Sequence, residues 1–249
     1  FRSAVDAAVN AGVDVISMSF GGIEQQYAPF RAALARARQH GVALVTGSGD
    51  TGVTMEGYPG MQQSYPATDA NVTAAGGTLL TLNSKGIREL PDVAWGPDVA
   101  GGASGGGVST LNALPSWQRG VRRVIPAGRN YPDVSMSGAL SGSVIIAITA
   151  PENGEQLYVP VAGTSEASPL FAGMIALATQ AAGMRLPNVN RALYKLAGKK
   201  GSGINDVVLG NNTFQKVPGY VAVEGYDRVT GVGTVWGPQF VPQLAKHGR

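Results

Sequence analysis

At 249 residues the chain is long enough for one large domain with its own core. Only 14% of the residues are charged, 36 are glycine and none is cysteine, which suits a loop-rich globular domain and excludes disulfides and thiolate metal sites. The formal charge of +3 comes from scattered basic residues, so we expect no nucleic-acid surface, and no apolar run reaches the roughly 18 residues of a membrane span.

The opening part of the chain alternates helical and extended patterns. Apolar residues at helical spacing predict helices over residues 1–11 and 28–39, and short apolar runs over 12–18 and 42–46 indicate buried strands. This order, with short connectors, predicts an α/β fold with a mostly parallel sheet and helices on both faces. Because the chain opens in mid-helix, without a methionine or a signal peptide, we expect the N-terminal part of the fold to lie upstream.

The rest of the chain is less regular. We expect a loop over 58–67, a strand over 71–77, a hairpin over 78–89, a flexible glycine tract over 101–107, a second hairpin from 143–150 and 156–161, a long helix over 165–183 and a last helix over 187–197 before an irregular end. No linker or repeat interrupts this order, which predicts a single domain over residues 1–249.

Ser165 lies where an apolar strand pattern, a glycine and a Thr-Ser pair lead into the long helix. Serine is a favoured helix cap, which is one interpretation. The other is a nucleophile, since the N–H groups of a helix N-terminus can stabilise a reacting carbonyl. Residues 47–52 fit the dinucleotide pattern G-x-G-x-x-G, but no helix is predicted after them and Asp50 would repel phosphate.

Several segments resemble one family. AGTSEASPLFAG around Ser165 resembles the nucleophile motif of subtilisin-like serine peptidases, VISMSFGG their substrate-pairing strand, and VALVTGSGD the strand of their oxyanion hole. Subtilisins place asparagine where this chain has Asp50, and aspartate there resembles the sedolisins, the serine-carboxyl peptidases. The segments YPATDANVTAAGGT, GGGVSTLNALPSWQ, RNYPDVS, INDVVLGNN and EGYDRVTGVGT agree, so the resemblance extends over about residues 13–234.

The resemblance implies a subtilisin-like α/β fold and a serine-type endopeptidase that forms an acyl-enzyme on Ser165. Asp50 and backbone N–H groups would form the oxyanion hole, and Ser19 and Gly21 would bind the substrate. A carboxylate cannot donate a hydrogen bond, so Asp50 must carry a proton, and we expect the intact enzyme to work in acid. Without the resemblance, we would interpret Asp50 as a turn residue in an Asp-Thr-Gly sequence.

In sedolisins the base is a glutamate oriented by an aspartate four residues later on one helix, and the resemblance places that helix upstream of this chain. We therefore expect the chain to lack its own base. Glu166 follows Ser165, but one helical step turns its side chain about 100° away. We expect Glu24 to be a solvated loop residue, His40 a surface histidine and Asp133 a structural residue.

Two alternatives remain open: a non-catalytic pseudo-peptidase or peptide-binding fragment, and a subtilisin whose histidine lies upstream. The former is favoured if the coding sequence carries no Glu-x-x-x-Asp helix before this chain, the latter if it carries a His-Gly-Thr segment.

The C-terminal region over 204–234 offers carboxylates and carbonyls, the oxygen ligands that suit calcium. The resemblance implies one Ca²⁺ ion, bound by the carboxylates of two aspartates and three backbone carbonyls, from Asp206, Val207, Val223, Gly225 and Asp227. It also implies a peptide or protein substrate, and a secreted, extracellular or lysosomal-type location. We expect a monomer without a membrane or nucleic-acid partner.

Overall fold

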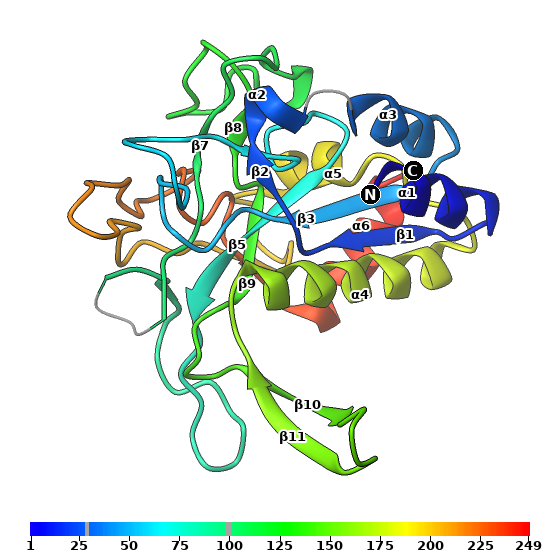
Figure 1. Ribbon diagram of the computed structural model, residues 1–249. Coiled ribbons are helices and arrows are strands. Elements are labelled where there is room, and N and C mark those ends of the chain that lie inside the picture. The colour runs from blue at the N-terminus through cyan, green and yellow to red at the C-terminus, as the bar shows by residue number, and fades with distance from the viewer. Residues whose placement is uncertain (28–29, 98–100) are drawn as a thin grey trace.

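The structure is a computed structural model that describes residues 1–27, 30–97 and 101–249, and its centre is a seven-stranded sheet (Figure 1). Its order is β1-β3-β5-β9-β13-β12, with β6 added to β5. The first four pairings along this order are parallel, whereas β12 and β6 run antiparallel to their neighbours. The strands are β1 (Val15–Met18), β3 (Ala43–Gly47), β5 (Thr73–Leu79), β6 (Val93–Ala94), β9 (Val134–Ser137), β12 (Ile204–Asn205) and β13 (Thr234–Val235).

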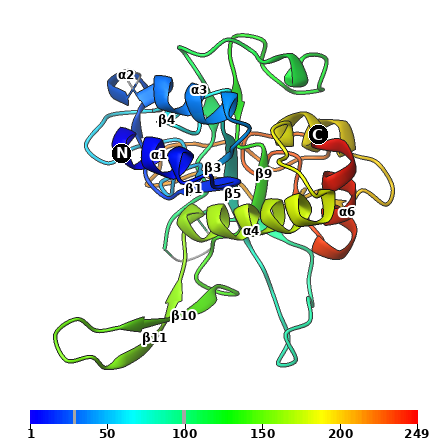
Figure 2. The ribbon, with the colours of Figure 1, turned by 90° about the vertical axis from the view of Figure 1, so that its right-hand side faces the viewer.

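Three smaller strand pairs lie outside this sheet: β2 with β4, β7 with β8, and β10 with β11. Their bounds are β2 (Gly22–Ile23), β4 (Ser64–Tyr65), β7 (Gly107–Val108), β8 (Asn130–Tyr131), β10 (Val144–Thr149) and β11 (Gln156–Val161). The β10–β11 hairpin projects from the body as a separate arm in both ribbon views (Figures 1 and 2). The predicted hairpin over 78–89 forms a second arm, bridged between Leu82 and Arg88.

Helices cover both faces of the sheet, as Figure 2 shows: α1 and α3 lie on one side and α4 on the other. The helices are α1 (Arg2–Asn10), α2 (Glu24–Tyr27), α3 (Arg31–Gln39), the 3₁₀ turn η2 (Ser116–Gln118), α4 (Thr164–Ala182), α5 (Val189–Leu196) and α6 (Gly237–His247). The predicted α/β architecture is therefore confirmed. The expected start of the second helix, at residues 28–29, lies outside the described residues.

The core divides between the two faces because strand side chains alternate. Val42 and Leu44 belong to the cluster beneath α1 and α3. Ala43 and Val45 belong to the larger cluster beneath α4, together with Phe171. The long helix α4 ends at Gly183, whose φ of +66° is the left-handed cap that glycine favours. The packing of Ala43 and Val45 against Phe171 positions α4, the helix that carries Ser165, on the sheet.

The prediction that the helix over 187–197 is the last one is wrong. Helix α6 follows near the C-terminus and packs against α4 with Phe240 and Leu244 fully buried. Its sequence carries Pro238 in the first turn and Pro242 inside, and proline lowers the helical signal of a segment. Tertiary burial of the apolar side chains overrides that local preference. No helix in the described part of the chain is long and apolar enough to cross a membrane.

Candidate active site

Ser165 is the second residue of α4 and lines an open cleft of about 260 Å³. Gly163 leads into the helix with a φ of +98°, a conformation that a side chain would strain. The cleft is shared by residues from distant segments: Ser19 and Gly21 after β1, and Asp50 after β3. Ser19 also donates a hydrogen bond from Oγ to the carbonyl of Ser165, at 3.0 Å. The structure therefore brings together the four residues that the sequence assigns to nucleophile, oxyanion and substrate binding.

Asp50 is held in one orientation by Thr164. Its Oδ1 accepts hydrogen bonds from the Thr164 backbone N–H and from Thr164 Oγ1, each at 2.7 Å. The Thr164 hydroxyl accepts in turn from the N–H of Gly49, at 3.0 Å. Oδ2 of Asp50 has no hydrogen-bond partner among residues 1–27, 30–97 and 101–249, and a Cβ at Gly163 would stand 2.5 Å from it. One oxygen of the carboxyl group is fixed and the other is free for a ligand.

The N-terminus of α4 supplies a second group for a ligand. The first N–H groups of a helix have no partner within it and carry partial positive charge. The N–H of Thr164 is used by Asp50 and that of Glu166 by the carbonyl of Gly163, at 3.0 Å. The Ser165 N–H has no acceptor in the described part of the chain. Ser165 and Asp50 line the same cleft, so a carbonyl oxygen beside the nucleophile could accept hydrogen bonds from this N–H and from Oδ2 of Asp50 when that oxygen carries a proton.

The glycine tract over 101–107 is not the flexible segment that its sequence predicts. The N–H of Gly105 donates to the carbonyl of Gly49 at 2.7 Å, and that of Ala103 donates to the carbonyl of Asp50 at 2.9 Å. A Cβ at Gly105 would stand 2.2 Å from the carbonyl oxygen of Ser48. From Gly102 onward the tract is thus close-packed backbone that fixes the loop of Asp50, whereas a Cβ at Gly101 would meet no neighbouring atom. Its glycines permit close approach, which composition alone does not distinguish from flexibility.

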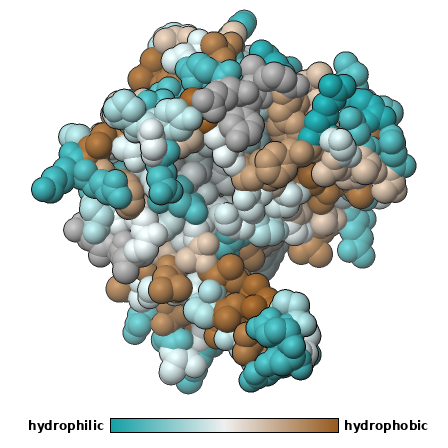
Figure 3. Space-filling view, viewed as in Figure 1, coloured by the Kyte–Doolittle hydropathy of each residue, from teal (hydrophilic) through white to brown (hydrophobic). Residues whose placement is uncertain are grey.

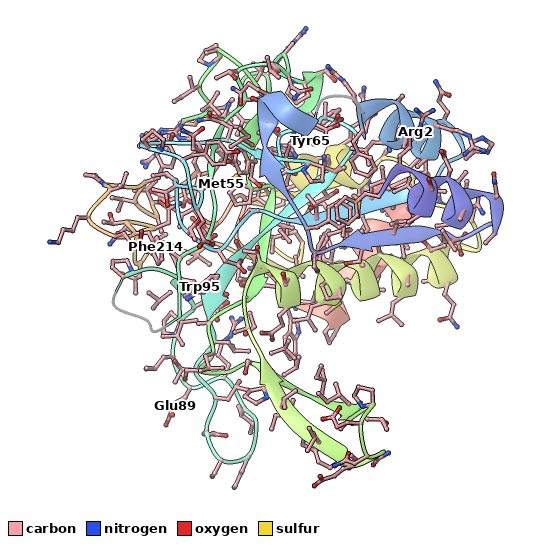
Figure 4. All side chains as sticks on the ribbon, viewed as in Figure 1. Arg2, Met55, Tyr65, Glu89, Trp95 and Phe214 are labelled. Carbon is pink, nitrogen blue, oxygen red and sulfur yellow. The ribbon has the colours of Figure 1, made fainter. Side chains whose placement is uncertain are left out.

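Sequence reasoning missed other contributors to the cleft. Phe20, Met55, Glu56 and Ser64 also line it, and Met55 lies on the loop that follows Asp50 (Figure 4). The Gly-Thr-Ser motif offered a signal for the role of Thr164. No spacing in the sequence pointed to Glu56, because the loop after Asp50 has no regular period.

Glu24 corrects a second prediction, because it is fully buried rather than solvated. Its carboxylate accepts hydrogen bonds from the Ser109 hydroxyl, from Thr110 N at 2.8 Å and from Asn112 Nδ2 at 3.0 Å. Burial raises its pKa, but these hydrogen bonds together outweigh burial and hold the pKa below the ordinary value. Glu24 therefore fastens α2 to the distant segment over 109–112, a pairing that the local sequence does not reveal.

Glu166 lies beside the nucleophile but faces the hairpin. Its side chain is 2% exposed, and Oε1 accepts a hydrogen bond from the N–H of Val144 at 3.1 Å. Oε2 is buried without a partner in the described residues. Burial raises the pKa of Glu166 to about 7, and the bond from Val144 opposes only part of that rise.

Asp133 and His40 also have surroundings of their own, apart from the cleft of Ser165. Asp133 is buried in an ion pair with Arg129 at 2.5 Å and accepts from the hydroxyl of Tyr194 at 3.0 Å. His40 caps the end of α3 at the surface. Within the described ranges, no side chain forms a hydrogen bond with the Ser165 hydroxyl.

The C-terminal loops bring the sequence-predicted calcium ligands into two connected turns. The N–H of Gly225 donates to Oδ2 of Asp206 at 2.8 Å, which joins segments 19 residues apart. Asp227 Oδ2 accepts from the N–H of Val223 at 3.0 Å, and burial raises the pKa of Asp227. Val207 is buried beside Asp206. The described residues hold no cluster of three or more His, Cys, Asp or Glu side chains able to bind a metal.

Comparison with known proteins agrees with this geometry. The sequence pattern of the Subtilase family matches residues 2–213. Kumamolisin from Bacillus sp. is 30% identical over 262 residues, which cover 98% of this chain and 45% of that protein. Sedolisin from Pseudomonas sp. is 34% identical over 225 residues, 86% of this chain and 36% of that protein. The chain thus spans less than half the length of these curated relatives.

A solved structure is similar over the full chain. The structure described as Pseudomonas sedolisin (serine-carboxyl proteinase) complexed with two molecules of pseudo-iodotyrostatin aligns with a TM-score of 0.84 and 30% identity. The alignment covers 100% of this chain and 70% of that one. These matches and the shared architecture establish the family: the chain belongs to the Subtilase family and, within it, to the sedolisins, the serine-carboxyl peptidases.

Proposed function

We propose that this protein is a serine-type endopeptidase that hydrolyses peptide bonds through an acyl-enzyme on Ser165. The observation that carries the proposal is the fixed carboxyl of Asp50, which Thr164 orients beside the nucleophile in an open cleft. A relative adds the class of reaction, since its structure is described as that of a serine-carboxyl proteinase.

The groups in the cleft supply the nucleophile and the oxyanion donors of this reaction. Ser165 Oγ attacks the carbonyl carbon of the scissile bond while its proton passes to a base. The carbonyl oxygen becomes an oxyanion, which accepts hydrogen bonds from the Ser165 N–H and from protonated Oδ2 of Asp50. The C–N bond breaks, the amine leaves with a proton, and water then hydrolyses the ester.

Asp50 provides the test. In the active enzyme, Asp50→Asn retains a donor at any pH, so activity should persist and lose part of its fall on the alkaline side. Asp50→Ala removes the donor and should lower kcat about 100-fold or more. The control is Glu89→Ala, which removes an exposed carboxylate outside the cleft and should behave as the parent (Figure 4). The proposal for Asp50 fails if Asp50→Ala retains full activity in acid.

A second candidate function is peptide binding without turnover. The observation that favours it is the Ser165 hydroxyl, which has no activating partner among the residues described. On this alternative the 249-residue chain binds peptides and Ser165→Ala leaves that affinity unchanged. Turnover of a peptide by this chain, abolished in Ser165→Ala, would contradict it.

We also propose one Ca²⁺ ion in the region over 204–234. Its support is the exposed carboxylate of Asp206 next to the turn of Gly225, together with the buried carboxylate of Asp227. Oxygen donors of this kind suit calcium, and a cation would offset the desolvation of Asp227. The carbonyls of Val207, Val223 and Gly225 would complete the set. The ion would stabilise these loops and takes no part in the reaction.

The proposed setting follows from the same chemistry. The proposed oxyanion hole requires a carboxyl of Asp50 that donates a hydrogen bond, so we propose an acidic extracellular or lysosomal-type compartment. Activity measured across a pH series tests the acidity of this setting, and the proposal fails if activity is highest in alkali.

A further inference from the structure

The β10–β11 hairpin has one wholly aliphatic face. Its strands pair in the register Val144↔Val161, Ile146↔Val159 and Ile148↔Leu157. Directly opposed residues share a face of the ribbon, and residues two apart along a strand do too. These six side chains therefore form one surface, which we call the aliphatic face of the hairpin. The opposite face is mixed: it carries Ile145, Ala147, Thr149, Gln156, Tyr158 and Pro160.

No other strand in the described residues pairs with this hairpin. On the aliphatic face Val144, Ile146, Ile148 and Leu157 are exposed, whereas Val159 and Val161 are half-buried. Ile146 is 39% exposed and Ile148 is 41% exposed. Figure 3 shows hydrophobic atoms gathered on this projecting part of the molecule. A two-stranded hairpin is marginally stable alone, and exposed apolar patches of this kind mark interaction surfaces.

The hairpin is continuous with the candidate active site. Strand β11 ends at Val161, four residues before Ser165, so the two backbones are separated by at most about 14 Å. At the other strand, the N–H of Val144 is bound by Glu166, the residue after the nucleophile. Figure 1 shows the arm leaving the body beside the end of α4 that carries Ser165.

The occupant follows from this continuity and from the size of the cleft. A 12-residue peptide is about 40 Å long when extended, so it reaches beyond an open cleft of about 260 Å³. Further residues must continue over the neighbouring surface. Strand β11 ends at Val161 and α4 begins at Thr164, so the hairpin leads directly into the segment that carries Ser165.

We propose that the aliphatic face of the hairpin binds apolar side chains of the peptide substrate, where the substrate leaves the cleft. This inference rests on the proposed peptidase function and names its substrate class: extended peptides with an apolar block several residues from the scissile bond. We expect the hairpin to recognise the peptide by side-chain contacts rather than by pairing with it as a further strand. Pro160 of β11 has no backbone N–H to donate, and proline is typical of strand edges that are not extended by another strand.

The test compares two labelled 12-residue peptides (about 40 Å when extended), measured by fluorescence anisotropy on the Ser165→Ala protein. The peptides share the residues around the scissile bond and differ distally, in alternating leucines or alternating serines. The leucine peptide should bind at least about tenfold more tightly. Ile146→Asp should remove this difference, whereas Ala147→Asp, the neighbouring position on the opposite face, should keep it.

Other outcomes overturn the proposal. Equal affinities for the two peptides, or equal losses in both variants, show that the aliphatic face does not select substrate. Sedimentation that finds a dimer in the parent and a monomer in Ile146→Asp assigns the face to a second copy of the chain. Cleavage of a short peptide by the active protein tests the peptidase function separately, since Ile146 lies outside the cleft.

Discussion

Replacing Glu166 by glutamine tests how the buried carboxyl beside the nucleophile affects stability. Glutamine has nearly the shape of glutamate, and its amide oxygen can accept the hydrogen bond from the Val144 N–H. It removes only the charge that glutamate gains as the pH rises. The change therefore isolates the cost of a carboxylate at a site that is 2% exposed.

The magnitude and sign follow from the pKa of Glu166, which burial raises from 4.5 to about 7. A folded-state pKa above the unfolded value means that the folded protein holds the proton more tightly. Protonation of Glu166 therefore stabilises the folded state. This stabilisation is complete below pH 4.5, declines as the pH rises to about 7 and is absent above that. The difference corresponds to at most about 3 kcal/mol in the free energy of unfolding.

Urea unfolding at pH 4 and pH 8 measures this difference in the parent, in Glu166→Gln and in a matched control, Glu155→Gln. Glu155 is an exposed carboxylate at the hairpin tip, so its substitution should change neither value. Relative to the parent, Glu166→Gln should gain about 2–3 kcal/mol at pH 8 and little at pH 4. Equal pH dependence in Glu166→Gln and the parent would refute the reasoning, as would a lower stability of Glu166→Gln at pH 8.

Three further predictions concern the supports of the site. Chelator should lower the Tm by about 5–10 °C if calcium was present at 100 times its Kd, and Asp206→Ala should abolish that shift in a melting curve; an unchanged curve counts against the ion. Gly163→Ala should cost about 1–3 kcal/mol in urea unfolding, because of its positive φ and the nearby carboxyl of Asp50; parent-like stability contradicts this. Asp133→Asn should cost about 3–5 kcal/mol by leaving Arg129 buried and uncompensated, and a loss below about 1 kcal/mol refutes it.

The sequence was sufficient to predict the elements and the candidate site residues where a local pattern or a family motif identified them. The parallel sheet, helix α4 and the β10–β11 hairpin follow from apolar periodicity and turn residues. Ser165 and Asp50 follow from motifs at the ends of an expected helix and an expected strand, and the structure brings them into one cleft. The role of each in catalysis stays a prediction.

The remaining features depend on contacts between distant segments. Glu24 has the sequence context of a loop, and only the return of the segment over 109–112 buries it. The glycines around Gly105 indicate a flexible backbone when only the local sequence is considered. In the structure Gly105 instead allows close packing against the backbone of Ser48. Helix α6 contains prolines that argue against a helix, and burial of Phe240 against α4 decides otherwise. Local preference cannot anticipate these contacts.

The strand order has a consequence for how quickly the protein folds. Neighbours in the sheet are far apart along the chain: Ala75 in β5 is opposite Val134 in β9, and Ser135 in β9 is opposite Thr234 in β13. Such parallel pairings require large loops to close, and this closure costs chain entropy before any stabilising contact forms. Folding is therefore slow, and the edges of partly paired strands stay exposed in the meantime. During synthesis the sheet cannot be completed until β13, which ends at Val235, has left the ribosome. Dilute chains and low temperature should therefore improve the refolding yield.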